Sequence, residues 1–248
     1  MPEPAGSPTD ALAFVAGATG YVGREVVRVL RERGVRTVAH VRPDSPRLAE
    51  WRDHFTAMGA EVDATPWEED AMAAALARLS PSHVFALLGT TQKRDRAARR
   101  AGKPPESYDT VDYGLTALLL RAAKHAPRPP RFVYLSAAGV GPGSRSPYMK
   151  VRHRMETELG ESGVPFTIAR PSFITGPDRD ERRPLERLGA GAVDAALAMA
   201  GAVGARRLRD RFRSTTNTDL AHALAAAAFD SGCVGATLEG EALRALSS

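Results

Sequence analysis

A strand, a glycine-rich turn and a helix follow one another close to the N-terminus, and this order constrains the fold more than any other feature. Residues 11–16 form an apolar run that is too short for a helix. Three glycines then recur at a spacing of three, and apolar residues continue at helical spacing up to Arg33, before the stop at Gly34. Such a turn presents backbone N–H groups and the positive end of a helix dipole to one point. A diphosphate binds well there.

We assign this turn and the first helical turn to cofactor binding, through Gly17, Thr19, Gly20, Tyr21, Val22 and Gly23. Gly17 lets the chain turn sharply, and Gly20 lets a diphosphate approach the backbone N–H groups. Gly23 lets the helix pack tightly on its strand. The alternative is a glycine-rich turn that binds no ligand.

The heptapeptide Gly-Ala-Thr-Gly-Tyr-Val-Gly at 17–23 resembles the fingerprint of the extended and atypical short-chain dehydrogenase/reductase superfamily. The resemblance implies a Rossmann fold that holds NAD or NADP. Strand and helix patterns also alternate along the chain, which favours an α/β protein with a doubly wound parallel sheet. We expect a disordered tail at 1–10, a Rossmann-type domain at 11–176 and a small C-terminal annex at 177–248, packed on the same core.

The end of the second predicted strand, 36–41, indicates which cofactor is preferred. NAD-binding folds place an acidic residue there to bind the adenosine ribose, but none lies between Arg36 and Pro43. Arg42 stands there instead, and a guanidinium binds a 2′-phosphate well. The sequence therefore favours NADP over NAD, with a solvated Arg42 as the alternative. The superfamily resemblance further implies that Asp63 bonds the adenine amino group.

The fourth predicted strand, 83–88, leads into Leu88, Gly89 and Thr90, which we assign to the wall of the cofactor site because ligands lie at the carboxyl ends of Rossmann strands. The next segment, 93–103, is rich in lysine and arginine. It is either solvated surface or a basic lid over phosphates or an anionic substrate. An amphipathic helix is predicted for 108–125.

The candidate catalytic residues are Ser136, Tyr148 and Arg152. They resemble the Ser…Tyr-x-x-x-Lys constellation of the superfamily, in which the tyrosine exchanges a proton with the substrate oxygen. Arg152 replaces the lysine, keeps its positive charge one helical turn from Tyr148, and does not readily join a proton relay. In a different register Ala137 takes the serine position, and Tyr148 alternatively serves only the helix structure.

The segment 169–176, Ala-Arg-Pro-Ser-Phe-Ile-Thr-Gly, extends the resemblance to the NmrA-like and Tat-interacting-protein oxidoreductases. That resemblance implies contacts from Pro171, Ser172 and Phe173 to the nicotinamide end. The alternative for Pro171 is a strand stop.

Composition limits the partners. The formal charge is +5, and arginine-dense runs at 178–187 and 206–213 would select an acidic substrate if they meet over the cleft. Phe212 is the single aromatic residue interleaved in these runs, too few for base stacking, which disfavours nucleic acid, and the histidines show no metal-ligand spacing. We expect no membrane span and a monomer or homodimer. Cys233 is the only cysteine and residues 1–10 have no apolar signal, from which we expect a cytoplasmic protein.

Two functions remain open from the sequence. The first is an NADP-dependent oxidoreductase that acts on a small carbonyl or alcohol, with Tyr148 as the proton donor. The second is a non-catalytic NADPH sensor or regulatory protein, which the missing lysine and the ambiguous serine position favour.

Overall fold

The first strand has the burial pattern of a strand covered on both faces. In a computed structural model of the chain, which describes residues 10–90, 95, 100, 102, 106–172, 174–175 and 215–247, all five residues of β1 (Leu12–Ala16) are buried. Phe14 points to one side of the sheet and Val15 to the other, because side chains alternate along a strand. A strand that is apolar on both faces requires helices on both faces.

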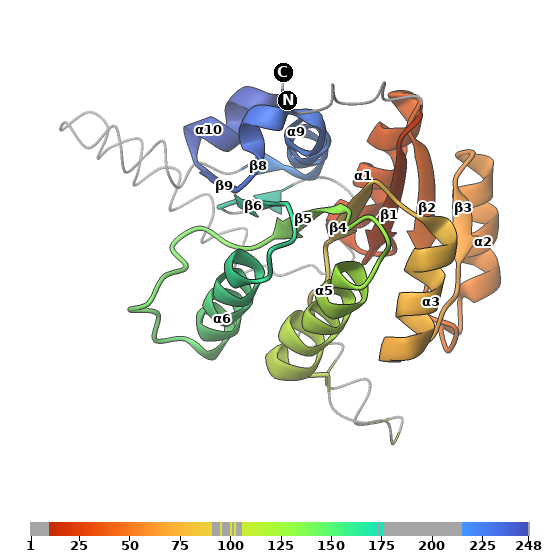
Figure 1. Cartoon of the computed structure of the whole chain (residues 1–248), viewed down its shortest axis with the longest axis horizontal. Coiled ribbons are helices and arrows are strands. Elements are labelled where there is room, and N and C mark those ends of the chain that lie inside the picture. The colour runs from red at the N-terminus through yellow and green to blue at the C-terminus, as the bar shows by residue number, and fades with distance from the viewer. Residues whose placement is uncertain are drawn as a thin grey trace.

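The main sheet has seven strands in the order β3-β2-β1-β4-β5-β6-β9, and all of their pairings are parallel (Figure 1). Its other strands are β2 (Arg36–His40), β3 (Glu61–Asp63), β4 (His83–Ala86), β5 (Arg131–Leu135), β6 (Phe166–Arg170) and β9 (Ala236–Glu239). A separate two-stranded sheet pairs β7 (Ile174–Thr175) with β8 (Thr215–Thr216). The order reverses between β1 and β4, the position where Rossmann folds bind dinucleotides. The predicted α/β fold is confirmed.

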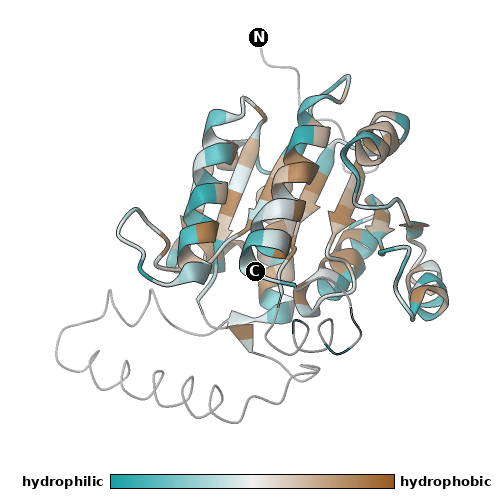
Figure 2. Ribbon diagram, turned by 90° about the horizontal axis from the view of Figure 1, so that it is seen from below, coloured by the Kyte–Doolittle hydropathy of each residue, from teal (hydrophilic) through white to brown (hydrophobic). Residues whose placement is uncertain are grey.

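Helices cover both faces of this sheet. One face packs against α1 (Tyr21–Glu32), α2 (Leu48–Ala57) and α9 (Asn217–Phe229). The other packs against α3 (Glu69–Leu79), α5 (Thr116–Lys124) and α6 (Pro147–Glu161), which lie side by side in Figure 1. Figure 2 shows the strands as mostly hydrophobic, with hydrophilic residues on the outer sides of the helices.

Residues 215–247, which belong to the C-terminal annex expected from the sequence at 177–248, pack against the same core as the Rossmann-type domain. Helix α9 packs on α1, and β9 extends the sheet beside β6. Helix α10 (Glu241–Arg244) and the short helix η4 (Ala245–Ser247) follow, after the turn η3 (Ser231–Cys233). The cap of α9 is Thr216, whose hydroxyl accepts from the Asp219 N–H.

The helix predicted at 108–125 begins with an eight-residue π-helix, η2 (Tyr108–Leu115), before it continues as α5. Ser107 and Thr110 form a reciprocal capping box at its start. Apolar spacing alone does not distinguish a π-turn from an α-turn, and π-helical segments occur often at functional sites.

Several sequence expectations fall on residues that are not described. They are the tail up to residue 9, most of 93–103, Phe173 and the arginine-dense runs 178–187 and 206–213. Within the described residues, no helix is both long and apolar enough to cross a membrane.

Candidate functional site

A cleft that opens to solvent lies at the carboxyl ends of the central strands, with about 540 Å³ of empty space when the open solvent at its mouth is included. Each of β1, β2, β3 and β4 leads into residues that line it, and η2 closes one side. The lining residues are Gly17, Thr19, Gly20, His40, Arg42, Trp67, Leu87, Leu88, Gly89, Val111 and Leu115. This is the place where Rossmann folds hold a dinucleotide.

The glycine turn has the geometry that the sequence predicted for it, with one revision. Gly17 has a φ of +84°, and a Cβ there would lie 2.6 Å from the Leu87 carbonyl oxygen, so the sharp turn requires glycine. At Gly23 a Cβ would collide with the Gly17 carbonyl oxygen. Gly23 therefore brings α1 against the turn itself rather than against the strand.

The start of α1 suits an anion. Gly20 is its N-cap and makes no side-chain cap hydrogen bond, and the first turn holds no acidic residue. Because glycine has no side chain, Gly20 does not cap the first backbone N–H groups of α1. Together with the lining glycines, they fit a dinucleotide diphosphate.

Arg42 lies on the wall of the same cleft, beyond the end of β2. Its Nη1 is 3.0 Å from Glu106 Oε1, and its Nε is 3.8 Å from Asp44 Oδ1. The Arg42 side chain is 39% exposed, whereas the Glu106 side chain is 15% exposed. A cation at this position is available to a negatively charged group on an adenosine ribose.

Two aromatic rings that the sequence analysis missed complete this end of the cleft. His40 and Trp67 lie edge to face, with ring centroids 4.8 Å apart. The His40 Nε2 is 2.8 Å from the Thr65 carbonyl oxygen, and burial lowers the pKa of His40. These rings offer an apolar wall for a base. The position of His40 at the carboxyl end of a predicted strand was the sequence feature that could have identified it as a cleft residue.

Asp63, predicted to contact adenine, does not line the cleft in the described part of the chain. Its Oδ1 accepts from the Thr65 N–H at 3.0 Å, and its Oδ2 is 3.3 Å from Arg78. Thr90 also lies outside the lining. Its N–H donates to Asp112 at 2.9 Å, beneath the wall that Gly89 forms.

The other described cofactor candidates are not among the residues that line the cleft. Val22 and Gly23 are buried in α1, and Tyr21 packs against the core. The Pro171 carbonyl oxygen accepts from the Ala138 N–H at 2.8 Å, and Ser172 follows it between β6 and β7. Their predicted contacts to the nicotinamide end remain predictions.

Arg152 and Tyr148 lie together on α6, as their spacing predicted. The Arg152 Cζ is 5.1 Å from the centroid of the Tyr148 ring. Tyr148 also meets Tyr108 of η2 edge to face, at 5.2 Å between centroids. Lys150, two residues along the helix from Tyr148, is exposed.

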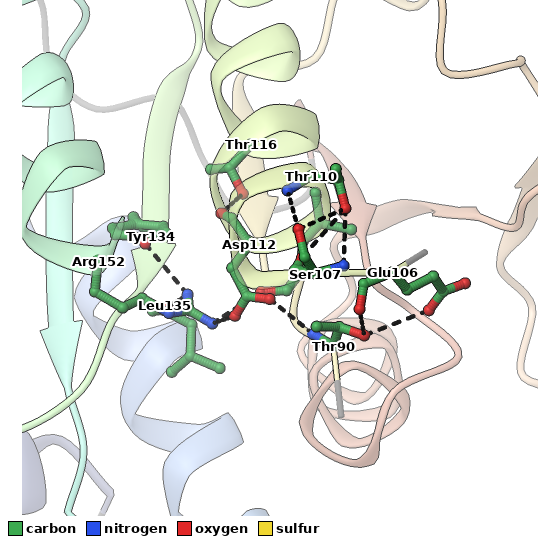
Figure 3. Close-up of polar contacts among 10 residues, drawn as sticks. Thr90, Glu106, Ser107, Thr110, Asp112, Thr116, Tyr134, Leu135 and Arg152 are labelled. Carbon is green, nitrogen blue, oxygen red and sulfur yellow. Dashed lines mark hydrogen bonds and ion pairs between the residues drawn. The ribbon is translucent and has the colours of Figure 1, made fainter. Parts of the chain in front are cut away.

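The Arg152 guanidinium is held by protein groups on several sides (Figure 3). Nη1 donates to the Tyr134 hydroxyl at 3.2 Å and to the Leu135 carbonyl oxygen at 2.6 Å. Nη2 donates to the Leu88 carbonyl oxygen at 3.1 Å and to Asp112 at 2.6 Å. Arg152 therefore ties the ends of β4 and β5 to η2, a role that a lysine with three N–H donors fills only in part.

Electrostatics keep this arginine charged. Burial by itself lowers the pKa of Arg152, but Tyr134, Tyr148 and Asp112 outweigh it and raise the pKa above its usual value. Burial raises the pKa of Tyr134 to about 12, so its phenol is neutral at physiological pH. Asp112 was missed in the sequence, although a carboxylate among the apolar residues of a predicted helix suggests a buried ion pair.

Ser136 is engaged elsewhere. Its hydroxyl donates to Glu156 at 2.5 Å, and Arg170 binds the same carboxylate with Nε at 2.9 Å and Nη2 at 2.5 Å. Glu156 lies about two helical turns beyond Tyr148. The structure thus brings Tyr148 and Arg152 together and directs the Ser136 hydroxyl to a buried ion pair.

Among the described residues, no group of three or more histidine, cysteine, aspartate or glutamate side chains is arranged to hold a metal ion.

Comparison with known proteins decides the family. The family model described as NAD(P)H-binding matches residues 17–230. The chain belongs to this NAD(P)H-binding family. The match begins at Gly17, the first glycine of the turn, and it confirms the resemblance to the atypical short-chain dehydrogenase/reductase superfamily. The narrower likeness to the NmrA-like group stays a prediction.

Individual relatives agree with this membership. The FMP52 protein of Coccidioides immitis is 30% identical over 71% of this chain and 70% of its own length. A candidate NAD-dependent epimerase/dehydratase from Bacillus halodurans superposes with a TM-score of 0.65 at 20% identity, covering 96% of this chain and 98% of its own. The enzyme WbmF of Bordetella bronchiseptica, solved with NAD+, gives 0.61 at 18%, covering 98% and 78%. At these identities the two structures show the shared fold.

One expectation is wrong. The FMP52 relatives are named as mitochondrial proteins, which contradicts the cytoplasmic location expected from the sequence. A lone cysteine suits any reducing compartment, and an apolar signal region marks secretion rather than mitochondrial import. Neither feature was evidence for the cytoplasm in particular.

Proposed function

We propose that this NAD(P)-dependent oxidoreductase-type protein uses NADP(H) in preference to NAD(H), and that it reduces a small carbonyl or oxidises the corresponding alcohol. The observation that carries the proposal is a single cleft that joins the Gly17–Gly20 turn to the guanidinium of Arg42. The turn accounts for a diphosphate, and Arg42 accounts for a 2′-phosphate.

Tyr148 is the proposed proton donor. When bound, the nicotinamide supplies the hydride that reduces the carbonyl carbon, and the Tyr148 hydroxyl supplies the proton to the oxygen. Loss of that proton leaves a negative phenolate beside the fixed positive charge of Arg152. Arg152 acts through this charge, because the N–H groups of its Nη1 and Nη2 hold Asp112 and the strand ends.

Binding tests the cofactor assignment. Replacing Arg42 by alanine removes the charged partner of a 2′-phosphate, and hydrogen bonds to charged groups contribute about 1.5–3 kcal/mol each. We expect Arg42→Ala to weaken NADPH binding about 10- to 100-fold and to leave NADH binding unchanged. Arg47→Ala, which removes an exposed arginine paired with Glu50, is the matched control and should change neither.

Turnover tests the catalytic assignment. With a panel of small carbonyls, Tyr148→Phe should lower kcat/KM about 10²- to 10⁴-fold while NADPH binding stays unchanged. Tyr113→Phe is the control, because the Tyr113 hydroxyl already donates to Glu158, at 2.6 Å. Equal activity of the wild type and Tyr148→Phe would refute the role of Tyr148.

A second function is favoured by one observation. The Ser136 hydroxyl is bound to Glu156, so the serine of the resembled catalytic set does not serve Tyr148 in this arrangement. A regulatory protein that binds NADPH without turnover would need no such serine. Tight NADPH binding combined with no NADPH oxidation over the carbonyl panel would support this function instead.

The substrate and the assembly are also proposals. We propose a small and anionic substrate, because the chain is basic and its arginines are numerous. We also propose that the protein is a monomer or a homodimer. Sedimentation equilibrium measures the assembly, and competition between acidic and neutral carbonyls measures the charge preference.

A further inference from the structure

The proposed 2′-phosphate site already contains a carboxylate. Glu106 Oε1 lies 3.0 Å from Nη1 of Arg42, and this glutamate is the more buried partner of the pair. It immediately precedes Ser107, the N-cap of η2, and η2 lines the cleft through Val111 and Leu115. Arg42 therefore faces Glu106 rather than solvent alone.

Glu106 is held in this position from behind. The Thr90 hydroxyl is within 3.4 Å of both the Glu106 carbonyl oxygen and its Oε2 (Figure 3). The Thr90 N–H donates in turn to Asp112, which is itself paired with Arg152. The carboxylate is thus attached to the fixed network beneath the cleft, whereas Asp44 on the other side of Arg42 is exposed and more distant.

We propose that Glu106 determines cofactor specificity by competing with the 2′-phosphate of NADP(H) for Arg42; this inference rests on the proposed function of Arg42. A guanidinium binds a carboxylate or a phosphate through the same N–H groups. A phosphate and a carboxylate on one guanidinium also repel each other. NADP(H) must therefore displace Glu106 from Arg42, and NAD(H), which carries no 2′-phosphate, need not.

The test removes the charge of Glu106 and keeps its shape. Glu106→Gln in the full chain should strengthen binding of adenosine 2′,5′-bisphosphate and of NADPH by about three- to tenfold, since it removes one competing ion pair and one repulsion. Binding of AMP and of NADH should not change. Asp44→Asn, which removes a more distant and exposed charge near the same arginine, should have a smaller effect. Isothermal titration calorimetry measures all of these.

A second variant keeps the test valid if Glu106→Gln fails to fold. Thr90→Val removes the hydroxyl that holds Glu106 and should shift NADPH binding in the same direction by a smaller factor. Unchanged NADPH binding in both Glu106→Gln and Thr90→Val would overturn the inference. So would weaker NADH binding in Glu106→Gln, which would mean that Glu106 accepts from the ribose 2′-hydroxyl and favours NAD.

The same binding data distinguish a failure of the Glu106 proposal from a failure of the Arg42 assignment. If the wild type prefers NADPH and Arg42→Ala abolishes that preference, but Glu106→Gln leaves it unchanged, only the role of Glu106 is refuted. If the wild type binds NADPH and NADH equally and Arg42→Ala changes nothing, the assignment of Arg42 fails, and the competition with Glu106 fails with it.

Discussion

The buried ion pair between Arg152 and Asp112 permits the sharpest stability prediction. Their side chains are 6% and 1% exposed, and Nη2 lies 2.6 Å from Oδ1. Removing one partner leaves the other charge buried without compensation, which costs about 3–5 kcal/mol. We expect each of Arg152→Met and Asp112→Leu to lower the free energy of unfolding by about this amount.

The double variant separates a buried charge from lost packing. Replacing both partners removes both charges, so the double variant should be more stable than the sum of the single changes predicts by about 3 kcal/mol or more. It should not fully regain wild-type stability, because the carbonyl oxygens of Leu88 and Leu135 lose their donor.

Urea unfolding with linear extrapolation measures these differences, and Arg121→Met is the control. Arg121 pairs with Glu69 at 2.9 Å, but the two side chains are 45% and 47% exposed, so its loss should cost less than about 1 kcal/mol. In thermal unfolding, the buried variants should lose roughly 6–20 °C, at about 2–4 °C per kcal/mol for a chain of this size. Losses below about 1 kcal/mol in both single variants, with additive effects in the double, would refute the structural role of this pair.

Two further predictions concern stability. Gly23→Ala places a Cβ 2.8 Å from the Gly17 carbonyl carbon, and it should lower the free energy of unfolding by about 1–3 kcal/mol and weaken NADPH binding. Gly160→Ala, at an open helical site, is the control and should raise the free energy of unfolding by about 0.5–1 kcal/mol. Denaturant titration compares the two variants, and a Gly23→Ala variant as stable as the wild type would contradict the close packing. Burial lowers the pKa of His83 to about 4 from its ordinary 6.5, so its contribution to stability is complete above pH 6.5 and is lost as the pH falls toward 4, by at most about 3 kcal/mol. His83→Gln should flatten the decline of stability over this pH range, and the slope that remains comes in part from His40. An unchanged decline would show that folding does not lower the pKa of His83.

The sequence predicted the order and type of the main elements because strand–turn–helix units have strong local signals. β1 and β2 each differ from the predicted bounds by one residue. β4 ends at Ala86 rather than at Leu88, although the Leu87 N–H still donates to Ala16 at 3.0 Å. The chain leaves the sheet there, and the Leu88 carbonyl oxygen accepts from Arg152, a contact between distant residues that no local pattern reveals.

The site was predictable where backbone geometry defines it and was missed where ion pairs define it. A positive φ and a collision with a Cβ explain why Gly17 and Gly23 are glycines, and their spacing alone indicated the turn. The partners of Arg42, Ser136 and Arg152 come from distant segments. The π-helical start of η2 also determines how Asp112 meets Arg152, and apolar periodicity does not report a π-turn.

We propose that NADP(H) binds in the cleft between the Gly17–Gly20 turn and Arg42, and isothermal titration of the wild-type chain with NADPH and then with NADH measures this binding. We expect one NADPH site per chain, with a Kd at least about tenfold lower than for NADH, a difference of about 1.4 kcal/mol. Equal affinities, or no binding of either cofactor, would contradict it.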